Sequence, residues 1–90
     1  MGLVKFPTGR IVATKGVMES IPDDELTTAI QRHVSGDWGD VCEEDKESNN
    51  SALKNGERLL SSYKSKDDIK FWIITEWDRS VTTFLLPEEY

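Results

Sequence analysis

Residues 71–86 read FWIITEWDRSVTTFLL, and this stretch decides the fold of the chain. Two runs rich in aromatic and β-branched side chains flank a short polar segment at Asp78 and Arg79. This composition predicts two antiparallel strands joined by a tight turn. The first run is apolar at both odd and even positions, which is typical of a central strand covered on both faces. The hairpin therefore supplies much of the core, and its polar tip is either a plain turn or part of a site.

Further apolar runs outside this hairpin predict the other strands of a sheet. The four expected strands span residues 10–14, 57–63, 70–77 and 80–86. The turn sets Thr75 opposite Thr82, and it places Trp72 and Ile74 on one face of the central strand. Because the last three strands follow one another with short connections, we expect them to form an antiparallel meander that the first strand joins.

Two helices are expected between the first strand and the meander. Residues 22–36 begin with proline, carry an apolar side chain at every fourth position and end with glycine, which is typical of an amphipathic helix. Asp40 is expected to cap a second helix, which runs to about residue 54 and ends at Gly56. The predicted fold class is α+β: an antiparallel β-meander of three to four strands with two helices packed on one face.

Length and composition indicate one folded domain over residues 1–90. The chain has 37% hydrophobic and 31% charged residues, which is typical of a folded rather than a disordered chain. Residues 1–9 contain Pro7 and Gly9, so this lead-in is expected to be loosely ordered. No apolar run approaches the roughly 18 residues that span a bilayer, and no secretory signal is recognised. With a single cysteine, the chain is expected to be cytoplasmic.

The charge is unevenly distributed along the sequence. The formal net charge is −6, and residues 17–50 carry ten acidic side chains against two basic ones. Such a balance opposes direct binding to nucleic acid and favours a protein partner with a basic surface. No membrane partner is expected, and the oligomeric state stays open.

Two polar segments are candidates for a binding site, and each has a plainer interpretation. His33 is either a base oriented by Asp37 or a cap for the carbonyl groups at a helix end. Trp38, between two glycines, is either an exposed aromatic anchor or a plug that folds back on the sheet. The hairpin tip, with Glu76, Asp78 and Arg79, is either a catalytic cluster whose groups shift one another's pKa values or an ordinary charged turn. The candidate binding residues are His33, Asp37, Trp38, Glu76, Asp78 and Arg79.

The sequence contains no complete catalytic set and implies no cofactor. One histidine and one cysteine do not supply a zinc site, and the spacing of the acids differs from a calcium-binding loop. The sequence also lacks a phosphate-binding glycine loop and a nucleophile elbow. No catalytic residues and no metal ligands are therefore assigned.

Four segments carry a resemblance to a known family. They are RHVSGDWGD at 32–40, LLSSY at 59–63, WIITEWDRSVTT at 72–83 and LLPEEY at 85–90. In these segments the chain resembles a family of small, uncharacterised bacterial proteins named plasmid-related or hypothetical proteins. Some are catalogued as subunit M of type I restriction-modification systems. The resemblance implies a setting near plasmids, phage or defence genes, and it supplies no catalytic residues. A methyltransferase needs a much longer cofactor-binding domain with a glycine-rich loop.

The sequence leaves three functions to compare. The favoured one is a non-enzymatic accessory or protein-interaction protein associated with mobile DNA. The first alternative is an acidic mimic of DNA that inhibits a restriction or other defence complex, which requires the acids to form one continuous face. The second alternative is a small hydrolase or nuclease, which requires the candidate residues to converge within hydrogen-bond reach.

Overall fold

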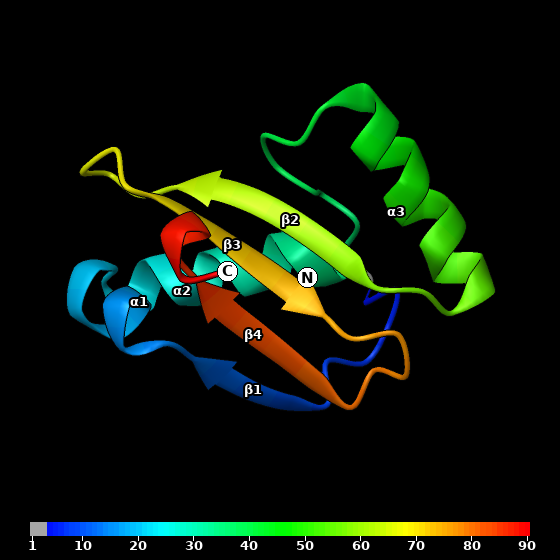
Figure 1. The fold of residues 1–90 in the computed structure, drawn as a ribbon, viewed down its shortest axis with the longest axis horizontal. Coiled ribbons are helices and arrows are strands. Elements are labelled where there is room, and N and C mark those ends of the chain that lie inside the picture. Colours follow the sequence, from blue (N-terminus) through cyan, green and yellow to red (C-terminus); the bar gives the residue numbers. More distant parts are fainter. Residues whose placement is uncertain (1–3) are drawn as a thin grey trace.

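The computed structural model describes residues 4–90 as one four-stranded mixed sheet with three α-helices (Figure 1). The strands are β1 (Arg10–Ala13), β2 (Leu59–Lys64), β3 (Lys70–Thr75) and β4 (Val81–Leu85). The helices are α1 (Lys15–Ser20), α2 (Asp23–Val34) and α3 (Glu43–Asn55), and a 3₁₀ turn, η1 (Pro87–Glu89), follows β4. The predicted α+β class is therefore confirmed.

The order of the strands in the sheet is β1-β4-β3-β2. Strands β2, β3 and β4 are antiparallel neighbours, and Thr75 lies opposite Thr82 as predicted. Strand β1 pairs with β4 in parallel, so the prediction of a purely antiparallel meander is wrong. The reason is that a long connection of three helices and two strands separates β1 from β4 and permits either direction, whereas only a tight turn forces an antiparallel pair.

The helices begin and end largely where their local chemistry dictates. Helix α2 follows Pro22 and carries three acidic residues in its first turn, where the helix dipole favours negative charge. Helix α3 ends at Gly56, which adopts a left-handed conformation with φ of 69°. The prediction that Asp40 caps α3 is wrong, because α3 begins later, after Cys42. The Asp40 backbone amide instead donates to the carbonyl of Ser62 in β2.

The outer edge of β2 is closed by side chains and by a loop. The Asn49 side chain of α3 accepts a hydrogen bond from the backbone N–H of Leu60 and donates one to its carbonyl. The backbone of Trp38 and Asp40 then pairs with Ser62. Loop and helix together replace the missing neighbour of this edge strand, which protects it against pairing with another chain.

The two faces of the sheet are covered unequally. In Figure 1, α2 runs behind the sheet, α3 lies beside β2, and η1 lies in front. The expectation of two helices packed on one face therefore fails for α3, which lies along an edge. Behind the sheet, α1 and α2 pack on Tyr63, Phe71, Ile73 and Phe84 to form the main core.

The central strand β3 ends two residues earlier than predicted. Trp77 therefore leaves the sheet in the turn and is 65% exposed. Trp72 is half-buried, with its ring edge-on to Tyr90, because no α-helix among residues 4–90 covers its face. Residues 4–9 are anchored by buried Phe6 and by the Lys5 amide, which donates to the Val34 carbonyl, whereas residues 1–3 of the expected loose lead-in lie outside the described part.

Candidate functional site

His33 lies at the centre of a buried chain of hydrogen bonds behind the sheet. Its side chain is fully buried, as are those of Ser61 in β2, Thr75 in β3 and Thr82 in β4. The register places these three strand residues on the same face as the main core, facing α2. We refer to these four side chains and the Thr8 carbonyl as the buried polar chain.

The last member of the buried polar chain fixes the direction of every hydrogen bond in it. The Thr8 carbonyl can only accept, so Thr82 donates its one hydroxyl proton there, over 2.8 Å. Thr75 must then donate to Thr82, and the Thr75 oxygen accepts from Nε2–H of His33 over 2.9 Å. His33 Nδ1 is left to accept from the Ser61 hydroxyl, over 2.5 Å. His33 is therefore the neutral Nε2–H tautomer with both nitrogens in use.

Burial and the nearby charge of Arg79 reinforce this neutral state. Desolvation, with a smaller contribution from Arg79, lowers the pKa of His33 to about 3. Asp37 does not orient the ring, since Ser61 and Thr75 hold both nitrogens. His33 is a structural residue, although its contacts differ from the helix-end cap considered from the sequence.

Trp38 is a plug and not an exposed anchor. It is only 3% exposed, stacks on Phe6 with ring centroids 6.1 Å apart, and meets the His33 ring edge-on. Its indole N–H donates to the side-chain carbonyl of Asn50 in α3 over 3.1 Å. The loop that carries Trp38 thus closes a second small core between α3 and the sheet.

Arg79 binds backbone carbonyl groups instead of a carboxylate. Its guanidinium donates to the carbonyls of Glu57, Glu76 and Ala52 over 2.6, 3.0 and 3.1 Å. The Ala52 carbonyl also accepts from the amides of Gly56 and Glu57, so Arg79 adds a further donor at the end of α3. Its guanidinium also lies 5.7 Å from the centre of the Phe6 ring. Arg79 therefore ties the β3–β4 turn to α3.

Each of the three acidic candidate residues forms a hydrogen bond or an ion pair within the fold. Asp37 accepts two hydrogen bonds from the Arg32 guanidinium, which hold the pKa of Asp37 below its usual value. Asp78 accepts from the Ser80 amide and hydroxyl, and these bonds likewise lower the pKa of Asp78.

Glu76 pairs with Arg58 across the β2–β3 boundary, with 3.3 Å between Nε and Oε1. Of the six candidate residues, the structure gathers His33, Trp38 and Arg79 around Phe6. Phe6 and the strand hydroxyls of the buried polar chain had no role in the sequence interpretation.

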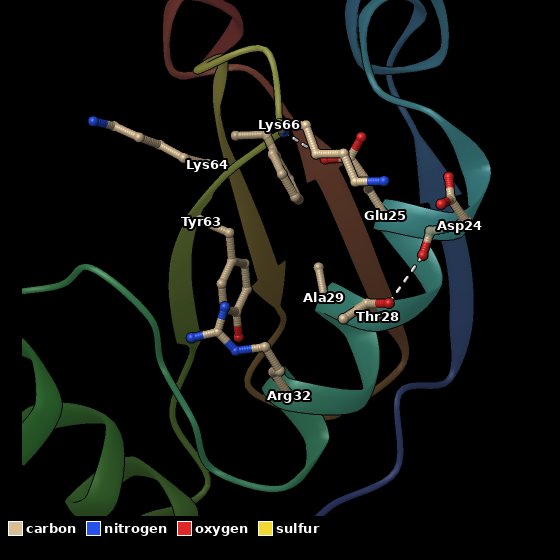
Figure 2. A pocket seen from close by; sticks show the side chains of 9 residues that line it. Asp24, Glu25, Thr28, Ala29, Arg32, Tyr63, Lys64 and Lys66 are labelled. Carbon is tan, nitrogen blue, oxygen red and sulfur yellow. Dashed lines mark hydrogen bonds between the residues drawn. The ribbon is translucent and has the colours of Figure 1, made fainter.

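A groove between α2 and β2 has a volume of about 270 Å³ (Figure 2). Tyr63, Phe71 and Ala29 give it an apolar floor, and the Arg32 guanidinium lies over the Tyr63 ring at 4.7 Å. Charged side chains form its rim: Asp24, Glu25, Lys64 and Lys66. In Figure 2, Lys64 points away from α2.

The chemistry of the groove suits binding better than catalysis. The pKa of Arg32 is raised by its hydrogen bond to Asp37, and burial raises the pKa of Tyr63 to about 12. Both groups therefore keep one protonation state near neutral pH, where a general acid or base must change state. The hydroxyl of Thr28 is also engaged, since it donates to the Asp24 carbonyl.

The face of the sheet opposite α2 forms a second candidate surface, which we call the open face. The register places its apolar side chains in two adjacent rows: Val12, Thr83, Ile74 and Leu60 in one, Leu85 and Trp72 in the next. A cavity of about 200 Å³ opens on this face between Arg58, Tyr90, Thr83 and Leu85, with Ile74 and Glu76 also in its lining.

Comparison of the chain with models of protein families, with curated proteins and with solved structures gives no match. Within residues 4–90, no cluster of three or more histidine, cysteine, aspartate or glutamate side chains could hold a metal ion. No helix in that part of the chain is long and apolar enough to cross a membrane.

Proposed function

We propose that this protein is a non-enzymatic accessory protein that acts by binding another protein, and that the open face is its docking surface. The observation that carries the proposal is the mismatch between the sequence of β3 and its surroundings. Strand β3 is apolar on both sides, yet among residues 4–90 only η1 and Tyr90 lie over the side that carries Trp72. Ile74 and Leu85 are buried there, whereas Trp72, Leu60 and Val12 stay partly exposed. Sites where a local pattern is not satisfied within the fold are often functional.

The reactive side chains among the candidate residues are engaged in contacts within the fold, which also supports binding over catalysis. His33 is buried and neutral, Arg79 is committed to three carbonyl groups, and Asp37 is bound to Arg32. A hydrolase or nuclease would need at least one of these groups to face a substrate. Enzymatic function therefore has less support than an interaction role.

The positions of the acidic residues give less support to mimicry of DNA. The acidic first turns of α2 and α3 contain Asp23, Asp24, Glu25, Glu43, Glu44 and Asp45. In Figure 1, α2 begins beside α1 at the left, whereas α3 begins at the top right. Two separated clusters fit one row of phosphates poorly. The proposed setting near mobile DNA depends on the sequence resemblance alone.

The proposal is tested by placing a charge on the open face. Thr83 is half-buried on this face, whereas Thr27 is exposed on α2 and serves as the matched control. We expect the immobilised wild-type chain and Thr27→Arg to retain the same protein from a lysate of the natural host, and Thr83→Arg to lose it. Equal retention by both variants, each shown to be folded by circular dichroism, would refute the proposal.

A further inference from the structure

The charge of the open face differs from that of the whole chain. Four exposed basic side chains lie at the ends of its strands: Arg10 and Arg58 at one end, Lys64 and Lys70 at the other. Glu76 follows β3 beside Arg58, and Arg58 already pairs with it. The molecule carries −6 overall, so its acids are concentrated elsewhere, chiefly on α2 and α3.

Nearby acids reduce this local positive charge without removing it. Asp68 lies 3.5 Å from the Lys64 ammonium group, and Glu88 is exposed on η1. Arg10 and Lys70 have no ion-pair partner within residues 4–90. One unpaired basic side chain therefore remains at each end of the strands.

The apolar rows lie between these basic ends, and a helix that runs along β3 would cross both rows. Strand β3 is six residues long, or about 20 Å at the usual rise of a strand. A helix of about 13 residues covers the same length at 1.5 Å per residue. Helix α2, with 12 residues, covers the opposite face of this sheet. A helix of similar length on the open face would complete a layered α/β/α arrangement.

The cavity on the open face supplies a position for one inserted side chain. Its volume is about 200 Å³, and Ile74, Thr83 and Leu85 give it an apolar lining. Arg58 and Tyr90 form its rim, where the guanidinium donates to the phenol oxygen over 2.9 Å. A leucine or phenylalanine from an apolar helix stripe suits such a cavity.

We infer that the open face binds an amphipathic helix of a partner protein, with an apolar stripe on the two rows and acidic side chains at both ends against the basic pairs. This inference depends on the proposed function, because it names the chemistry of the partner at the same surface. It differs from the basic partner that the net charge favours, since the net charge is set by the helices and not by this face.

Two other occupants fit the open face less well. Single-stranded nucleic acid needs accessible aromatic faces, but Trp72 is half-buried and edge-on to Tyr90, and Glu76 lines the cavity on this face. A helix from a second copy would need a free apolar stripe, whereas Leu26 and Ile30 of α2 and Leu53 of α3 already pack in their own cores.

Fluorescence anisotropy with a labelled synthetic peptide tests the inference. The probe is a helical peptide of about 14 residues, with leucines at i, i+3, i+4 and i+7 and glutamates at both ends. The control peptide carries lysine in place of each glutamate. We expect the acidic peptide to bind at least about tenfold more tightly than the basic one, with an affinity that falls as salt rises.

Charge reversal on the protein gives the matched comparison. Lys70→Glu, on the open face, should weaken binding of the acidic peptide about fivefold, as expected for an exposed ion pair replaced by a repulsion. Lys66→Glu, on the groove rim, should leave it unchanged. Both residues are exposed, so neither substitution threatens the fold.

Three outcomes would overturn the inference. They are equal binding of the acidic and basic peptides, an unchanged affinity in Lys70→Glu, or tighter binding of a 12-nucleotide oligo-dT than of the acidic peptide. If the peptide fails while Thr83→Arg still loses the captured protein, the partner chemistry is wrong and the proposed function stands. If Thr83→Arg also retains that protein, both the partner chemistry and the proposed function are wrong.

Discussion

Replacement of His33 by glutamine should remove most of the pH dependence of stability between pH 7 and pH 5. The chain has a single histidine, so every imidazole effect in this range belongs to His33. Burial lowers the pKa of His33 to about 3, whereas the unfolded chain titrates near the ordinary value of about 6.5. Below pH 6.5 the unfolded state therefore binds a proton that the folded state does not, and the wild-type protein loses stability as pH falls.

The size of this effect follows from the two pKa values. The free energy of unfolding is about 2 kcal/mol lower at pH 5 than at pH 7, because it falls by about 1.4 kcal/mol for each pH unit below 6.5. A 90-residue domain has a total stability of roughly 5–13 kcal/mol, so the change is large enough to measure. Hydrogen bonds lower the pKa values of Asp37, Asp78 and Glu89, so their contributions begin to be lost only below about pH 5.

Urea denaturation at pH 7, 6 and 5 measures this difference. His33→Gln should be less stable than wild type by about 1–3 kcal/mol at pH 7, because its amide satisfies the buried polar chain imperfectly, but it should show little further loss at pH 5. Thr75→Val is the matched control: it should also be less stable at pH 7 yet keep the pH slope of the wild type. A wild-type midpoint that does not change between pH 7 and pH 5 would refute the neutral, buried assignment of His33.

Three further substitutions test the framework around the site, each by the urea midpoint. Arg79→Met should cost about 1–2 kcal/mol, because the Glu57 carbonyl loses its side-chain donor and those of Glu76 and Ala52 keep only backbone donors; an unchanged midpoint would contradict the role assigned to Arg79. Gly39→Ala should cost well over 1 kcal/mol and more than Gly56→Ala, since a Cβ at Gly39 would meet the Ser62 carbonyl oxygen at 2.0 Å, while one at Gly56 would meet nothing; equal costs would count against the loop pairing. Trp72→Ala should cost about 2 kcal/mol, less than the 3–5 kcal/mol typical of a fully buried aromatic, and a larger loss would show that its face is covered.

Local sequence patterns predicted those parts of the fold that local chemistry determines. The β-branched hairpin predicted the pairing of Thr75 with Thr82, and Gly56 predicted the end of α3. The direction of β1 was not predictable in the same way, because a long connection leaves both directions open. Asp40 failed as a helix cap because its backbone was needed to close the edge of β2, a demand that exists only in the folded sheet.

The candidate site was harder to predict, since its contacts join distant positions. His33 lies 28 residues from Ser61 and 42 from Thr75 along the chain. One signal was present: Thr75 shares the core-facing side of β3 with Phe71 and Ile73, and a buried hydroxyl there needs a polar partner. The net charge of −6 favoured a basic partner, but it does not show that basic side chains gather at the ends of the open face.

Methyl NMR of the chain titrated with its purified captured protein tests most directly whether the open face is the docking surface. The methyl groups of Leu60, Ile74 and Leu85 lie on this face, whereas those of Ala29 and Thr28 line the groove beside α2. We expect the first three signals to shift on binding while the groove signals keep their positions. Shifts confined to Ala29 and Thr28, with Ile74 and Leu85 unchanged, would show that the open face is not the docking surface.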